Sequence, residues 1–114
     1  MNIDKSLITG STTMLVLKLL EEKDMYGYEM IETLSAKSNN TFSLKAGTLY
    51  PILHGLEKKG ILISYEENAD NSRIRKYYHI TDKGKKLLVD KTTEWNIYSK
   101  AVNQVLGGVN FGTI

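Results

Sequence analysis

The spacing of the apolar residues changes from helical to strand-like once along this chain and then changes back, which sets the order of its elements. Up to Lys59 the apolar residues recur every three or four positions. Residues 61–66 and 75–80 are instead short runs rich in β-branched and aromatic residues, separated by the polar segment 67–73. The helical spacing returns after Thr81. The pattern therefore predicts one hairpin with a long tip, flanked by helices.

Three helices are predicted before the hairpin. They are expected within residues 7–20, about 26–37, and 43–59. Pro51 lacks a backbone N–H and is tolerated only near the first turn of a helix, which places the start of the third helix near Gly47. Gly60 follows two lysines and is a typical helix stop.

A long final helix is predicted from Asp82 to about Leu106, with Thr81 and Asp82 as candidate N-caps. Its larger apolar residues recur at spacings of 7, 3, 4 and 3 positions, and they are Leu88, Trp95, Tyr98, Val102 and Val105. This spacing is typical of a helix that packs along another helix. We expect these five residues to form the interface of a homodimer.

The order of these elements predicts the fold class. Three helices followed by a two-stranded hairpin are the arrangement of a winged helix-turn-helix, so the chain is expected to be mainly α with a two-stranded wing, plus a long C-terminal dimerisation helix. A domain of 114 residues is only marginally stable alone, and packing the last helix on a second copy would relieve this.

The third helix is the candidate recognition helix. Its apolar residues must face the core, which leaves the opposite face free to enter the major groove of DNA. The residues expected to meet bases or phosphates are Lys45, Thr48, Tyr50, His54 and Lys58. The alternative is a solvated helix face without a partner.

Basic residues gather in the hairpin and at the start of the last helix. Six of the chain's 15 basic residues lie there, and they are Arg73, Arg75, Lys76, Lys83, Lys85 and Lys86. Such residues suit phosphates or a narrow minor groove, although charge on a hairpin also keeps an edge strand soluble. Beside a candidate recognition helix, the cluster favours nucleic-acid binding, even though the net charge is only +2.

Tyr26 and Tyr28 flank Gly27 at the expected start of the second helix. The free N–H groups of a helix start favour a phosphate, and tyrosine hydroxyls add donors. The alternative is that one ring closes the core and the other covers it.

Several classes of function are disfavoured. The absence of cysteine excludes disulfides, thiolate zinc sites and cysteine catalysis. No apolar run approaches ~18 residues, so no membrane span is expected, and without a signal-peptide pattern the chain is expected in the cytoplasm. His54 and Glu57 offer at most two metal ligands. We therefore expect no enzyme activity, cofactor or metal.

Five short blocks in the sequence are characteristic as a set. They are Tyr26-Gly27-Tyr28-Glu29, Gly47-Thr48-Leu49-Tyr50-Pro51-Ile52-Leu53, Leu56-Glu57-Lys58-Lys59-Gly60, Arg75-Lys76-Tyr77-Tyr78 and Thr81-Asp82-Lys83-Gly84. In order and spacing they resemble the PadR family of bacterial transcriptional regulators, over roughly residues 7–95. Because a long C-terminal region is absent, the chain resembles the short subfamily, which ends in a single dimerising helix.

The resemblance implies a homodimeric repressor that binds an inverted-repeat operator in double-stranded DNA. The alternative is a winged-helix module that contacts other proteins or senses a ligand without binding specific DNA. Carried over by residue, it implies Tyr26 and Tyr28 beside the DNA backbone, Gly47, Thr48, Tyr50 and Pro51 at the opening of the recognition helix, His54 on its DNA-facing side, and Arg75, Lys76 and Tyr77 in the wing. The expected division is a DNA-binding domain over residues 1–81, a dimerisation helix over 82–106 and a flexible tail over 107–114.

Trp95 is the only tryptophan. At an interface it is either a packing anchor or, facing its symmetry mate, part of a cavity that stacks planar ligands. The resemblance implies the second role, because family members respond to small aromatics and a drug-binding member of the short subfamily carries a tryptophan here. The resemblance places Met14 and Trp95 in that pore. Helical register from Trp95 adds Leu87, Lys91 and Ser99, where the sequence departs from that member. The cation of Lys91 is expected to disfavour cationic drugs.

Overall fold

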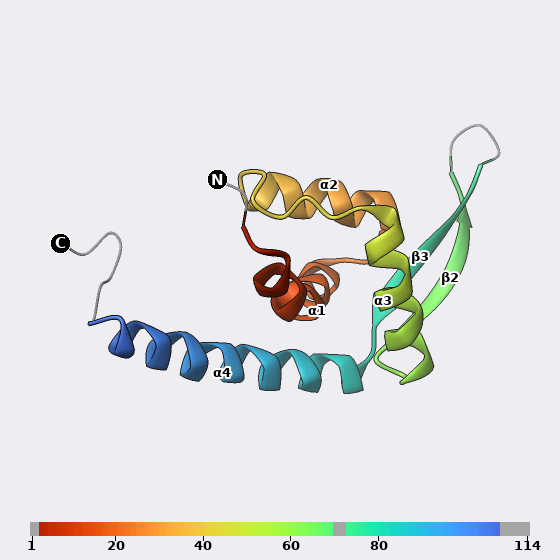
Figure 1. Cartoon of the computed structure of the whole chain (residues 1–114). Coiled ribbons are helices and arrows are strands. Elements are labelled where there is room, and N and C mark those ends of the chain that lie inside the picture. The colour runs from red at the N-terminus through yellow and green to blue at the C-terminus, as the bar shows by residue number, and fades with distance from the viewer. Residues whose placement is uncertain (1–2, 70–72, 108–114) are drawn as a thin grey trace.

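The computed structural model describes residues 3–69 and 73–107, so the expected tail falls almost entirely outside the described residues. The elements in chain order are α1 (Lys5–Glu22), β1 (Met25–Tyr26), α2 (Gly27–Lys37), α3 (Ala46–Lys58), β2 (Leu62–Asn68), β3 (Ile74–Ile80) and α4 (Asp82–Val105). The first three helices and the sheet pack together, and α4 runs past α1 and away from the sheet (Figure 1). The winged helix-turn-helix with a long last helix is confirmed.

The core forms where the apolar stripes of the three short helices meet the inner face of the sheet. Leu17 of α1, Leu49 and Leu53 of α3, and Leu62 and Tyr78 of the hairpin are 0% exposed. Burying a leucine side chain contributes about 1.5–3 kcal/mol relative to leaving it exposed. Since α3 places its buried stripe against α2 and β2, its other face is turned outward.

The start of α4 is locked to the root of the wing. Thr81 caps the helix by accepting a hydrogen bond of 3.1 Å from Gly84 N–H. A Cβ on Gly84 would collide with the Ile61 carbonyl oxygen and with the Ile80 side chain, so only glycine lets α4 pack this closely. The direction of α4 is therefore set by its first turn.

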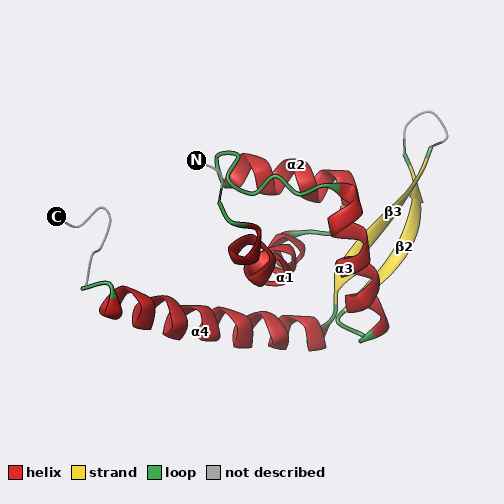
Figure 2. Cartoon of the chain, viewed as in Figure 1, coloured by secondary structure: helices red, strands yellow, loops and turns green. Residues whose placement is uncertain are grey.

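The sheet has one more strand than the hairpin predicted from sequence. The two-residue strand β1 pairs antiparallel with β3 through Met25 and Tyr78 and through Tyr26 and Tyr77, giving the order β1-β3-β2. A segment of two residues has no detectable period, which is why the pattern did not predict it. The added strand ties the start of α2 directly to the wing. Figure 2 shows the two long strands of the wing, β2 and β3, beside α3.

Pro51 lies further into its helix than expected. The third helix begins at Ala46, near the predicted Gly47, but Pro51 then falls in the second turn. The missing N–H would have bonded to the Gly47 carbonyl, four residues earlier. Gly47 is exposed, so water can satisfy that carbonyl and the helix continues.

The apolar seam of α4 divides into two parts. Leu88 is 5% exposed and belongs to the core of its own chain, because the first turns of α4 lie against α1. The placement of Leu88 in the dimer interface is therefore corrected. Tyr98 is 58% exposed and Val105 is 87% exposed, so these two residues of the seam stay largely uncovered in the described chain.

Candidate nucleic-acid interface and ligand pocket

The outward face of α3 presents a stripe of polar residues. Thr48, Pro51, His54 and Lys58 are exposed and follow one another at intervals of three or four positions, opposite the buried leucines. Lys45 and Gly47 are exposed at the start of the same helix. The structure therefore brings most of the residues predicted for DNA readout onto one accessible helix face.

Tyr50 is placed differently from the rest of this set. It is half-buried, and its ring fills the space beside Gly27 that a Cβ would otherwise occupy. That Tyr50 reaches a base or phosphate stays a prediction, because its ring is held against Gly27 but also lines the groove next to the wing. Its ring sets how closely the start of α2 approaches α3.

A groove of about 410 Å³ lies between the starts of α2 and α3 and the wing. Its lining comprises Tyr26, Tyr28, Glu32, Tyr50, Arg73, Ile74, Arg75 and Lys76. The groove brings the predicted wing cations next to the tyrosines at the start of α2. The sequence did not predict Glu32 as part of this groove. The spacing of an acidic residue on an exposed helix face does not show which distant residues lie next to it.

Arg75 is held in a defined position in this groove. Its guanidinium carbon lies 4.3 Å from the centre of the Tyr26 ring, and Tyr26 meets Tyr77 edge to face at 5.5 Å. A cation stacked on an aromatic ring is stabilised by about 0.5–1 kcal/mol at an exposed site. Tyr26 and Tyr77 thus orient the Arg75 guanidinium, and this role is separate from their predicted contacts with DNA.

A hydrogen-bonded cluster fixes the outer face of the wing at its root. Tyr65 stacks on Tyr77 at 5.7 Å and donates a hydrogen bond of 2.6 Å to Asp24 Oδ2, while His79 Nδ1 lies 2.7 Å from Asp24 Oδ1. Burial opposes ionisation of Asp24, but the hydrogen bonds from Tyr65 and His79 outweigh it and lower its pKa. The same hydrogen bond raises the pKa of Tyr65 to about 12. The sequence did not predict this cluster, because Tyr65 and His79 lie 41 and 55 residues after Asp24.

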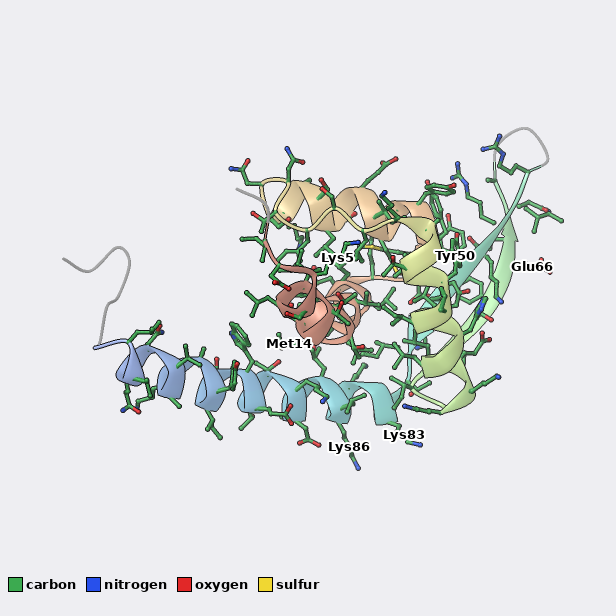
Figure 3. The ribbon with its side chains drawn as sticks, in the orientation of Figure 1. Lys5, Met14, Tyr50, Glu66, Lys83 and Lys86 are labelled. Carbon is green, nitrogen blue, oxygen red and sulfur yellow. The ribbon has the colours of Figure 1, made fainter. Side chains whose placement is uncertain are left out.

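The six basic residues that cluster in sequence separate in space. Lys83 and Lys86 project from the first turns of α4, whereas Glu66 lies on the wing (Figure 3). Lys83 Nζ donates a hydrogen bond of 2.7 Å to the Lys59 carbonyl at the end of α3. Strand β3 carries the chain from the wing tip to its root, so Lys83, Lys85 and Lys86 lie beyond that root, at the start of α4, and of the six only Arg73, Arg75 and Lys76 line the groove.

A second hollow, of about 280 Å³, lies between α1 and α4. It is lined by Ser6, Leu7, Gly10, Ser11, Met14, Lys91, Glu94, Trp95 and Tyr98. Three of the predicted ligand residues, Met14, Lys91 and Trp95, therefore meet. Leu87 lines a neighbouring hollow, whereas Ser99 is absent from the lining, and its Oγ lies 3.4 Å from the Asn96 carbonyl of its own helix.

Glu94 changes the expected charge of this pocket. Its Oε1 lies 3.5 Å from Lys91 Nζ, so the cation that was expected to repel cationic ligands is paired. The spacing of three residues on a helix could have indicated this pair from sequence. Lys91 and Glu94 together give the pocket lining no net charge, so the expected bias of Lys91 against cationic ligands is corrected.

The described residues contain no cluster of three or more side chains suited to hold a metal. No helix in residues 3–69 and 73–107 combines the length and apolar character needed to cross a membrane.

Comparison with known proteins places this geometry among transcription factors. A family model described as the transcriptional regulator PadR-like family matches residues 16–90. The chain is 30% identical over 93 residues to the transcriptional regulator Rv3488 of Mycobacterium tuberculosis, covering 82% of this chain and 80% of that protein. It is also similar to a solved transcriptional regulator from Clostridium thermocellum, with 34% identity, a TM-score of 0.80 and coverage of 87% and 96% of the two chains. A PadR family regulator from Eggerthella lenta matches with 35% identity, a TM-score of 0.79 and coverage of 89% and 86%.

Proposed function

Because the chain belongs to the PadR-like family of transcriptional regulators, we propose that it is a homodimeric repressor that binds an inverted-repeat operator in double-stranded DNA. One observation carries this proposal: the exposed polar stripe of α3 lies beside a groove that holds Arg75 and Lys76. A helix that fits the major groove and adjacent cations that fit phosphates are the two parts of a DNA-reading surface. In this proposal residues 1–81 bind DNA and residues 82–106 form the dimer.

The apolar surface of α4 supports the dimer. Trp95, Tyr98, Val102 and Val105 are between 38% and 87% exposed in the single chain. A helix–helix interface along this seam would bury them and would place two recognition helices about one turn of DNA, ~34 Å, apart. The operator would then have two half-sites related by a twofold axis.

We further propose that a planar aromatic molecule binds between α1 and α4 and releases the DNA. Trp95 offers a ring face for stacking, and Met14 offers an apolar wall of the same pocket. Since Trp95 lies on the proposed dimer helix, a ligand there can change the spacing of the two halves. Titration with a panel of planar aromatic dyes should quench the fluorescence of the single tryptophan, and an unchanged signal across the panel would leave Trp95 as a packing anchor only.

The main experiment is selection of bound sequences from random DNA duplexes, repeated with a dye that quenches Trp95. The expected result is an enriched inverted repeat with half-sites centred about one helical turn apart, and weaker enrichment with the dye. An intact dimer that enriches no sequence at low salt would contradict the proposal.

A ligand-sensing module without specific DNA binding is the second candidate. The pocket at Trp95 favours it, because that pocket exists in the single chain, separate from the groove beside the wing. Tight dye binding together with equal affinity for all duplexes would support this candidate over a repressor.

A further inference from the structure

Glu57 joins the recognition helix to both strands of the wing hairpin. It lies in the last turn of α3, which ends at Lys58. One carboxylate oxygen accepts a hydrogen bond of 2.5 Å from Ser64 Oγ on β2, and the other lies 3.8 Å from Lys76 Nζ on β3. A single side chain therefore connects all three elements that the proposed function assigns to DNA.

This connection lies where the hairpin leaves the core. The strand register places Leu62 opposite Ile80, Ser64 opposite Tyr78, and Glu66 opposite Lys76, all on the inner face of the hairpin. Leu62 and Tyr78 are 0% exposed, whereas the Lys76 side chain is 47% exposed. Lys76 is thus the first inner-face residue of β3, moving toward the tip, that can reach either the core side or a bound molecule.

Two contacts hold the Lys76 ammonium on the core side. Besides its ion pair with Glu57, it lies 5.5 Å from the centre of the Tyr78 ring. A carboxylate offers an ammonium the same kind of charged oxygen acceptor that a phosphate does. Both side chains are between one-third and one-half exposed, so the pair is screened and weak, and a DNA phosphate can replace the carboxylate.

Building on the proposed function, we propose that Glu57 is a positioning residue that holds Lys76 in the free protein and competes with the DNA backbone for it. The competition lowers the affinity for DNA of any sequence, because phosphates are present in all of them. Bases read by α3 are unaffected by this exchange. Glu57 therefore weakens the part of DNA binding that is common to all sequences, so a larger share of the binding free energy depends on the DNA sequence.

The test measures affinity for a duplex of random sequence at one salt concentration with four proteins: wild type, Glu57→Gln, Lys76→Gln and the double variant. Glutamine keeps an oxygen that can accept the Ser64 hydrogen bond but loses the charge. Glu57→Gln should bind about two- to fivefold more tightly than wild type, as expected for removing one exposed ion pair. That gain should disappear when Lys76 is already replaced, since the two residues act as a pair.

Glu66→Gln is the matched control. It removes the same charge from the same face of the hairpin, next to Lys76, and Glu66 is not the acid that pairs with Lys76 in the described part of the chain. An equal gain from Glu66→Gln, or a gain from Glu57→Gln that persists without Lys76, would show a general charge effect and overturn the inference. Weaker binding by Glu57→Gln would overturn it too, by showing that the residue only supports the wing. Failure of wild type to bind any duplex at low salt would instead overturn the DNA-binding proposal itself.

Discussion

The wing side of the molecule and the C-terminal half of α4 differ in how their exposed residues are held. On the wing side, Arg75 stacks on Tyr26, Asp24 ties Tyr65 to His79, and Glu57 holds Lys76. Along α4, Tyr98 and Val105 are exposed, with no such network around them. One chain therefore organises its own candidate DNA-binding groove, whereas the exposed residues of its α4 seam would be covered only in the proposed dimer.

The largest effect should come from disrupting the α4 seam. Tyr98→Glu places a charge in the proposed interface, so the protein should become monomeric and lose the advantage of binding two half-sites together, about 10²–10⁴-fold in operator affinity. Analytical ultracentrifugation and operator titration would measure both changes. Ile97→Glu is the control, because Ile97 is 68% exposed on the same helix but outside the seam. Equal loss of the dimer in both variants would mean that the seam is assigned to the wrong face.

Replacing a readout residue on α3 should have the next largest effect. His54→Ala is expected to cost about 1–3 kcal/mol on the preferred operator and little on other duplexes, because a lost base contact affects only the sequence it reads. Competition between operator and random duplex measures this difference. A uniform loss on both would assign His54 to the phosphate backbone instead.

The wing cation Arg75 should show the opposite pattern. Arg75→Ala is expected to weaken binding to all duplexes several-fold and to lower the slope of log affinity against log salt by ~1, since one phosphate contact is lost. Lys76→Ala should lower the slope similarly but weaken binding less, because removing Lys76 also removes its competition with Glu57. Salt titrations of the three proteins test this, and an unchanged slope in both variants would rule out phosphate contacts by the wing.

The smallest expected effect concerns the wing root. The pKa of Asp24 is lower in the folded protein than its usual 3.8, so its charge stabilises the fold above pH 3.8, and this stabilisation disappears as the pH falls through the lowered value. Asp24→Asn should reduce the free energy of unfolding by about 0.5–1 kcal/mol at pH 7. Urea unfolding should show that the difference from wild type shrinks at pH 3. A difference that stays constant with pH would mean that the charge of Asp24 contributes nothing.

The sequence predicted the features that depend on a regular spacing of apolar residues or on a strong local motif. The stripe of Leu49 and Leu53, the stop at Gly60 and the cap at Thr81 each depend on a few neighbouring residues, and the structure confirms them. Prediction from sequence failed where a partner is distant in sequence or an element is too short. Strand β1 and the Asp24 cluster are of this kind, as is the separation of Lys83 from Arg75.

The sequence by itself determined the order of elements, the outward face of α3 and the apolar seam of α4, because helical and strand periods are local properties of the chain. Only the tertiary structure decided which polar groups meet. It set the Tyr50 ring against Gly27, buried Leu88 in its own chain, and paired Lys76 with Glu57. The physical reason is that a charge or ring acts over a few ångströms, and which groups lie that close is set by the packing of elements rather than by their spacing in sequence.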